Sequence, residues 1–124
     1  MRINIKATGI ELTPAISDYV HKKVSSIEKF ASNPDAVAHV EVGKNSEHHK
    51  SGNVFKAEVH IIGGGLDLYA VSEQADLYAA IDIMKDEVVH ELMHEKTRKE
   101  TLARRGAQAI KNMIRGINIF KRRP

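Results

Sequence analysis

The chain has 124 residues, of which 28% are charged and 42% hydrophobic, and it contains no cysteine. This length supports one domain with its own core, and the absence of cysteine excludes disulfides, thiolate nucleophiles and cysteine-ligated zinc. No apolar run approaches the roughly 18 residues that a membrane span needs, and Met1–Gly9 lacks the pattern of a signal peptide, so we expect a cytoplasmic protein.

The net charge of +3 averages two unlike parts of the chain. Residues 96–124 hold ten basic side chains and one acidic side chain, a net charge of +9, and residues 1–95 carry a net charge of −6. Such an asymmetry usually concerns partners rather than folding. Its sign favours a polyanion, either nucleic acid or an anionic membrane surface.

The first third of the chain predicts a strand, a helix and a second strand. Residues 2–8 alternate polar and apolar side chains, which is typical of a half-buried strand. Thr13 is a suitable N-cap for a helix with Pro14 at its first position. We expect this helix to continue to Pro34, with one apolar stripe formed by Ile16, Val20, Val24 and Ile27. Residues 36–42 alternate again.

The rest of the chain predicts a hairpin and a long helix. Residues 55–61 alternate, a turn is expected at residues 52–53, and the triple glycine at 63–65 indicates a tight turn into residues 66–71. The long helix is expected to start near Ser72 or Asp76 and to run past residue 100, because nothing breaks it before Gly106. Its apolar stripe is Leu77, Ile81, Met84, Val88 and Leu92. A second apolar stripe follows, and we interpret residues 107–119 as a further short helix. The stripe consists of Ala109, Ile110, Met113, Ile114 and Ile117.

This order of elements predicts an α+β fold. We expect a β-α-β-β-β-α two-layer sandwich, in which two helices cover one face of a four-stranded mixed sheet and a basic C-terminal extension follows. The initial strand, helix and strand require a crossover connection. The last three strands can form an antiparallel meander.

One motif suggests zinc chemistry, because His90, Glu91 and His94 form a literal H-E-x-x-H pattern on the predicted helix. A catalytic zinc needs three protein ligands and an open position, and the glycine and third histidine with which the metzincin motif continues are absent from the next six residues, 95–100. The adjacent pair His48–His49 in a polar loop is weak support for a ligand site. We therefore expect no metal and no cofactor, and a zinc-dependent hydrolase remains the alternative.

Other polar residues have simpler interpretations. His39 and His60 are expected to share the outer face of the sheet with Glu41, Lys56 and Glu58, where cross-strand polar pairing accounts for them. Asp82 and Asp86 look like solubilising charge on a helix flank. The sequence has no nucleophile elbow, phosphate-binding loop or dinucleotide fingerprint, so we expect no catalytic residues and no enzyme.

Two segments and one strand resemble a known family. Leu12–Val20, followed by Lys22–Lys23 and Ile27–Phe30, is similar to the first-helix signature of the ribosome hibernation factors, which are also called ribosome-associated inhibitors or the sigma-54 modulation family. Asp76–Asp82 is similar to the second-helix signature, and Ala57–Ile61 fits the third strand. The resemblance covers roughly residues 1–100 and indicates a short form of the family.

The resemblance implies a function without catalysis. A member of this family would bind the small (30S) ribosomal subunit and its 16S rRNA, occupy the mRNA/tRNA channel, and stabilise inactive 70S ribosomes under stress or in stationary phase. Residues 1–100 would form the ribosome-binding domain and 101–124 a basic extension. We further expect no membrane partner, and a monomer off the ribosome.

The resemblance also selects candidate rRNA contacts. The basic positions that match those of the family are Lys22, Lys23, Lys29, Lys96, Arg98 and Lys99. Arg104 and Arg105, in the basic extension, are expected to supply compensating contacts. They would compensate because this chain has Glu87, His90, Met93 and His94 in the middle of the second helix, where the family usually has basic residues.

Overall fold

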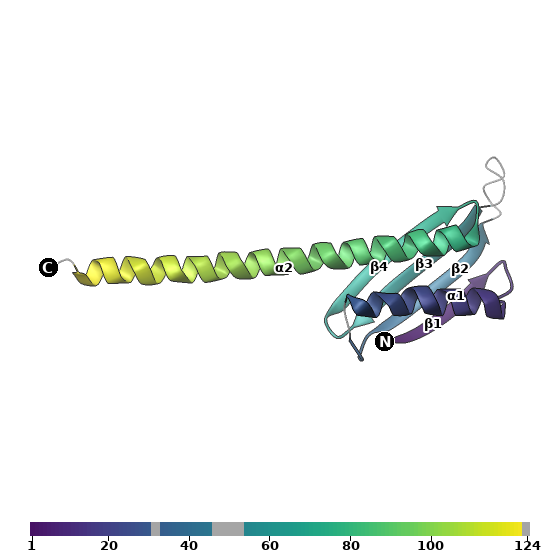
Figure 1. Cartoon of the computed structure of the whole chain (residues 1–124), viewed down its shortest axis with the longest axis horizontal. Coiled ribbons are helices and arrows are strands. Elements are labelled where there is room, and N and C mark those ends of the chain that lie inside the picture. Colours follow the sequence, from purple (N-terminus) through teal and green to yellow (C-terminus); the bar gives the residue numbers. More distant parts are fainter. Residues whose placement is uncertain (31–32, 46–53, 123–124) are drawn as a thin grey trace. The chain divides into compact units, whose positions relative to one another are not determined.

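The computed structural model describes residues 1–30, 33–45 and 54–122, with side chains through residue 114. The elements, in order, are β1 (Arg2–Thr8), α1 (Pro14–Ser25), the short 3-10 helix η1 (Ser26–Lys29), β2 (Val37–Asn45), β3 (Val54–Gly63), β4 (Leu66–Gln74) and α2 (Leu77–Arg122), labelled in Figure 1. This order confirms the expected β-α-β-β-β-α fold. The pair His48–His49 and the turn expected at residues 52–53 lie outside the described residues.

The chain divides into two compact units, unit 1 (Met1–Leu92) and unit 2 (Met93–Pro124). Unit 1 contains the sheet, α1 and the first part of α2. Unit 2 contains the remainder of α2. Among the described residues, no helix is both long enough and apolar enough to cross a membrane.

The sheet of unit 1 has the strand order β1-β2-β3-β4. β1 pairs with β2 in parallel, whereas β2 with β3 and β3 with β4 pair antiparallel. The sheet is therefore mixed, as expected, and β2, β3 and β4 form a meander.

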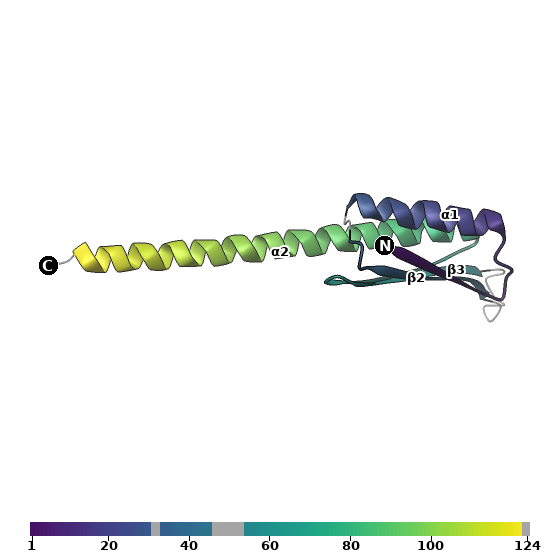
Figure 2. The same cartoon turned by 90° about the horizontal axis from the view of Figure 1, so that it is seen from below.

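One face of the sheet carries the core of the protein. α1 and the first part of α2 both lie on this face, as the edge-on view in Figure 2 shows. Alternate strand residues point into the core, and α1 and α2 contribute the expected stripes. The largest fully buried side chains are Val20, Val24 and Ile27 from the first helical region, Val42, Val59, Ile61 and Leu68 from the strands, and Ile81, Met84 and Val88 from α2.

The turn between β3 and β4 depends on backbone conformations that favour glycine. Gly63, Gly64 and Gly65 all have positive φ angles, at 115°, 60° and 84°. A Cβ atom on Gly63 would lie 2.5 Å from the backbone oxygen of Asp35. The side-chain amide of Asn33 donates a hydrogen bond of 2.7 Å to the carbonyl oxygen of Gly64. The glycines thus bring this turn close to the segment that leads into β2.

α1 begins where the sequence predicts and ends earlier. The Thr13 hydroxyl accepts a hydrogen bond of 3.2 Å from the backbone N–H of Ile16, which confirms the cap. The expectation that the helix continues to Pro34 is wrong, because α1 ends at Ser25 and is followed by η1. The Ser26 hydroxyl donates to the carbonyl oxygen of Lys23. A serine that bonds its local backbone in this way competes with the regular helical pattern.

α2 is longer than predicted. It starts at Leu77, after Asp76, whose carboxylate accepts a 3.1 Å hydrogen bond from the backbone N–H of Ala79. It then continues through Gly106 to Arg122, so the expectation of a separate helix over residues 107–119 is wrong. A single glycine costs a helix only about 1 kcal/mol relative to alanine. The strong helix formers on both sides of Gly106 can offset that cost.

Candidate nucleic-acid interface

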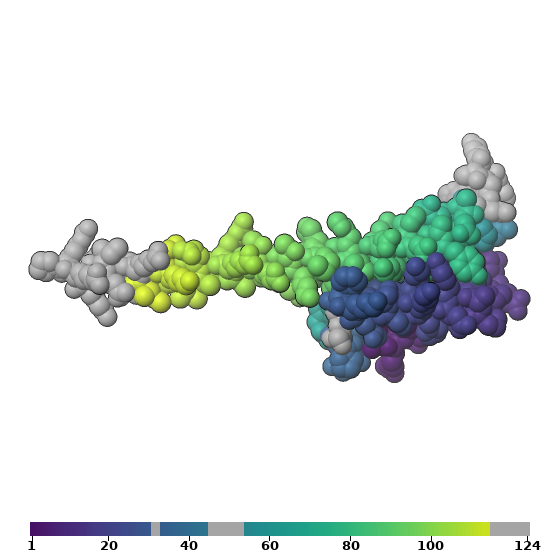
Figure 3. Space-filling model, viewed as in Figure 1, coloured from purple at the N-terminus to yellow at the C-terminus, as the bar shows by residue number. Residues whose placement is uncertain are grey.

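Three of the predicted RNA-binding lysines come together on the helical face of unit 1. Lys22, Lys23 and Lys29 follow one another along α1 and η1. With Ser25, Ser26 and Lys85 they line a hollow of about 500 Å³. The helices that carry these residues are on the side of unit 1 that faces the viewer in Figure 3. Four ammonium groups around one hollow make this a basic site.

Lys85 is the member of this group that the sequence reasoning missed. It lies on α2, next to the buried Met84, and it reaches the hollow because α1 and the first part of α2 share one face of the sheet. A signal for it was present, since Lys85 is the only lysine or arginine between residues 77 and 95. Whether Lys85 joins the lysines of α1 depends on how the two helices pack against each other, and helical periodicity alone does not predict that packing.

A carboxylate on α2 connects Lys23 to an aromatic pair. The Tyr19 hydroxyl donates a 2.6 Å hydrogen bond to Oδ1 of Asp82, and Nζ of Lys23 lies 3.2 Å from the same oxygen. The Tyr19 ring packs edge-on against Tyr78 with ring centres 4.9 Å apart. Asp82 is therefore a link between α1 and α2, and the expectation that it is merely solubilising charge is wrong.

The electrostatics of this link are consistent with an ionised carboxylate. The hydrogen bond from Tyr19 and the nearby ammonium of Lys23 hold the pKa of Asp82 below its ordinary value, against a smaller opposing effect of burial. In turn, the bond to Asp82 raises the pKa of the Tyr19 hydroxyl and that of the Lys23 ammonium. At neutral pH the cluster holds one carboxylate, one ammonium and a neutral phenol.

The other predicted contacts lie in unit 2, along α2. Lys96, Arg98, Lys99, Arg104 and Arg105 are all exposed. Nη2 of Arg98 lies 3.7 Å from a carboxylate oxygen of Glu95, one turn earlier. At about 100° of rotation per residue, the five side chains point in directions spread around the helix. They supply positive charge on several sides of unit 2 rather than a single basic face.

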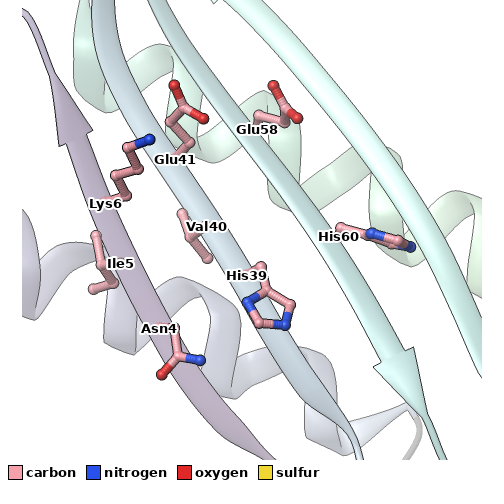
Figure 4. A pocket seen from close by; sticks show the side chains of 8 residues that line it. All are labelled: Asn4, Ile5, Lys6, His39, Val40, Glu41, Glu58 and His60. Atoms are coloured by element: carbon pink, nitrogen blue, oxygen red, sulfur yellow. The ribbon is translucent and has the colours of Figure 1, made fainter.

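The open face of the sheet carries the polar residues that were expected there. His39 lies opposite His60, and Glu41 lies opposite Glu58, on the neighbouring strands β2 and β3. With Lys6 and other residues of β1 and β2 they line a shallow hollow of about 360 Å³, shown in Figure 4.

Two residues that line this hollow, His60 and Glu58, each contact a side chain of opposite type. Nε2 of His60 lies 2.7 Å from a carboxylate oxygen of Asp67, and Nζ of Lys56 lies 2.9 Å from a carboxylate oxygen of Glu58. The lysine lowers the pKa of Glu58. His60–Asp67 joins β3 to β4 and the Thr8 hydroxyl on β1 donates to Glu41 on β2, whereas Lys56 and Glu58 lie on the same strand, so cross-strand polar pairing accounts for part of this surface.

The H-E-x-x-H motif does not assemble a metal site among the described residues. His90 and His94 are both exposed on α2. In the part of the chain that the structure describes, no group of three or more histidine, aspartate or glutamate side chains is arranged to hold a metal ion. Within the described residues, the two histidines therefore have no third ligand of the kind that zinc catalysis needs.

Sequence comparison supplies relatives for most of the chain. The family model described as "Sigma 54 modulation protein / S30EA ribosomal protein" matches residues 3–100. A ribosome hibernation promoting factor from Klebsiella oxytoca is 33% identical over 96 residues, which cover 77% of this chain and 94% of the relative. The ribosome hibernation promoting factor from Azotobacter vinelandii is 30% identical over 99 residues, which cover 80% of this chain and 86% of the relative.

Solved structures share the fold. The N-terminal domain of Protein Y from Thermus thermophilus superposes with a TM-score of 0.63 at 28% identity, covering 74% of this chain and 96% of that chain. A ribosomal subunit interface protein from Coxiella burnetii superposes with a TM-score of 0.65 at 18% identity, covering 78% of this chain and 99% of that chain. The second likeness supports the fold alone.

The family model and the relatives together define a ribosome-associated protein without enzymatic activity. The chain belongs to the Sigma 54 modulation protein / S30EA ribosomal protein family. This confirms the family and the non-enzymatic character that the resemblance implied. Its general role is that of a ribosome hibernation protein.

Proposed function

We propose that the chain binds the small (30S) ribosomal subunit through its 16S rRNA and occupies the mRNA/tRNA channel. By occupying the channel it would keep 70S ribosomes inactive and intact under stress or in stationary phase. It would act in the cytoplasm, where ribosomes are. The observation that carries the proposal is the hollow in which Lys22, Lys23, Lys29 and Lys85 come together from α1, η1 and α2.

The chemistry of the hollow suits RNA phosphates. Folded rRNA is recognised largely through its shape and its phosphates, and lysines that neutralise phosphates gain affinity by releasing condensed counterions. Lys22 and Lys29 are exposed, so their ammonium groups can reach a phosphate at little cost. Ser25 and Ser26 add hydroxyl groups at the same place.

The basic residues of unit 2 extend the proposed contact. We assign Lys96, Arg98 and Lys99 to a ribosome-binding domain over residues 1–100. Arg104 and Arg105 belong to a basic extension over residues 101–124 that adds compensating phosphate contacts. The chain would be a monomer off the ribosome. One copy would bind one small subunit and block its channel by occupying it.

Co-sedimentation of the full chain with purified small subunits across a salt series tests the proposal. The double variant Lys22→Gln with Lys85→Gln removes two charges from the hollow. The double variant Lys6→Gln with Lys44→Gln removes two charges from the strands and is the matched control. The hollow variant should bind more weakly, and its slope of log affinity against log salt should be shallower by roughly 1.5 to 2.

Two results would contradict the proposal. Binding by the wild-type chain that does not change with salt would exclude a phosphate-based contact. Equal losses in the two double variants would show that only total charge counts and that the hollow is not the contact.

A further inference from the structure

One lysine of the proposed RNA site already has an anionic partner. Lys23 lines the hollow, and its Nζ lies 3.2 Å from Oδ1 of Asp82. An RNA phosphate that enters the hollow would meet an ammonium group that a carboxylate has partly neutralised.

We infer that Asp82 competes with RNA phosphate for Lys23, and that it thereby sets the affinity of the hollow. This inference rests on the proposed function. It makes Asp82 a residue that weakens binding while it holds α1 and α2 together through Tyr19. The removal of its charge is expected to give a protein that binds more tightly and folds less stably.

Two opposing effects of Asp82 have to be weighed. The carboxylate restrains Lys23 at the rim of the hollow, which could favour binding by preorganisation. It also repels any phosphate that approaches the same ammonium. Lysine is a flexible point charge with three equivalent donors, so it needs little preorganisation to contact a phosphate. The repulsion therefore dominates.

The size of the repulsion follows from the geometry. A phosphate oxygen that accepts a hydrogen bond from Nζ lies about 2.8 Å from it, and the Asp82 oxygen lies 3.2 Å from Nζ. The two anionic oxygens are then at most about 6 Å apart. At this separation, with an effective dielectric constant of about 40 to 80 for groups that solvent screens well, one unit of like charge lowers affinity by roughly three- to tenfold.

The surroundings of Asp82 keep this competition in place at neutral pH. The groups that face its carboxylate are the Tyr19 hydroxyl and Lys23 from α1, with Lys85 from its own helix. These donors and cations lower the pKa of Asp82. The carboxylate therefore remains charged at neutral pH, and its effect on binding should change little around pH 7.

The experiment measures the affinity of the full chain for small ribosomal subunits. Asp82→Asn keeps an acceptor oxygen for the Tyr19 hydroxyl and removes the charge, and it should bind roughly three- to tenfold more tightly than wild type. Asp67→Asn removes the same charge from the open face of the sheet and should change affinity less than about twofold. Tyr19→Phe weakens the link between the helices but keeps the carboxylate, so it should lower stability without a gain in affinity.

Lys23→Gln gives a second test in which the carboxylate stays in place. Because Asp82 already offsets the charge of Lys23, this variant should lose less affinity than Lys22→Gln. A loss equal to or greater than that of Lys22→Gln would overturn the inference even if Asp82→Asn failed to fold.

The outcomes separate the inference from the proposed function. If the wild-type chain does not bind small subunits, the proposed function fails. If wild type binds and Asp82→Asn binds equally or more weakly, the proposed function stands and the competition is refuted. Weaker binding by Asp82→Asn would show in addition that Asp82 aids binding by positioning Lys23.

Discussion

Replacement of Lys56 by methionine should reverse the pH dependence of the protein's stability that arises from charged residues on the open face of the sheet. Glu41 and Glu58 lie directly opposite each other on β2 and β3. Lys56, two residues before Glu58 on β3, places its Nζ 2.9 Å from the Glu58 carboxylate. Lys56→Met removes the ammonium that offsets this pair of like charges and keeps a long aliphatic side chain.

The magnitude follows from the two interactions that change. An exposed ion pair contributes roughly 0.2–1 kcal/mol, and like charges at opposed cross-strand positions cost a similar amount. The Lys56 side chain is 36% exposed and that of Glu58 is 26% exposed, so solvent screens both effects. We expect Lys56→Met to lower the free energy of unfolding by about 1 kcal/mol at pH 7.

The sign of the pH dependence differs between the two proteins. In wild type the Lys56 ammonium lowers the pKa of Glu58. That stabilisation is therefore present above the pKa of the unfolded chain and is lost as the pH falls through the lowered pKa. In Lys56→Met the burial of Glu58, which raises its pKa more than either the Tyr69 hydrogen bond or the charge of His60 lowers it, and the opposed charge of Glu41 are expected to raise the pKa of Glu58. The folded state then takes up a proton more readily, and the variant should gain stability as the pH falls from 7 towards 5.

Urea unfolding followed by tyrosine fluorescence measures this effect in unit 1 alone, because Tyr19, Tyr69 and Tyr78 are the only tyrosines of the chain. Lys44→Met removes a charge from the other face of β2 and is the control. Parallel pH profiles for wild type and Lys56→Met would refute the reasoning. They would show that the opposed carboxylates do not interact appreciably.

The turn and the long helix give two further predictions, measured by the same fluorescence assay. Gly63→Ala should lower the free energy of unfolding by about 2–3 kcal/mol, because it adds a clash with the Asp35 backbone to an unfavourable φ angle. Gly65 has open space around it, so Gly65→Ala should lower the free energy of unfolding by only about 1 kcal/mol. Equal losses in the two variants would contradict this reasoning. Met84→Ala should lower the free energy of unfolding by about 2–5 kcal/mol, because Met84 is fully buried. Met113 is 66% exposed, so Met113→Ala should leave the unfolding transition unchanged. A shift with Met113→Ala would show that unit 2 supports the core.

Much of the fold could be predicted because its signals are local. The alternation of Ile3, Ile5 and Ala7 and the four- and three-residue spacing from Val20 to Ile27 report directly which faces are buried. The Thr13 cap and the glycine turn are short-range backbone features, and the structure confirms them. The ends of the helices could not be predicted from such signals. The Ser26 hydroxyl bonds the local backbone where α1 ends, and α2 continues through Gly106.

The site could be predicted only in part, because its arrangement is tertiary. Sequence resemblance identified Lys22, Lys23 and Lys29 as basic positions on one helix. It did not show that Lys85 from α2 joins them, or that Asp82 pairs with Lys23. Both facts depend on which sides of α1 and α2 meet across the core. A periodicity defines the buried side of each helix and leaves the neighbours on its flanks undetermined.

The division of α2 between the two units has a consequence for how such a chain can change under selection. Among the described residues, every buried hydrophobic side chain lies at or before Leu92, and four large apolar residues of unit 2, Leu102, Ile110, Met113 and Ile114, are more than half exposed. Folding therefore constrains the two parts of one helix very differently. Before Leu92 a substitution on the core stripe costs folding free energy, and after it a substitution acts mainly on what the helix contacts. If unit 2 contacts rRNA as proposed, those contacts can change by gradual drift while the core stays intact.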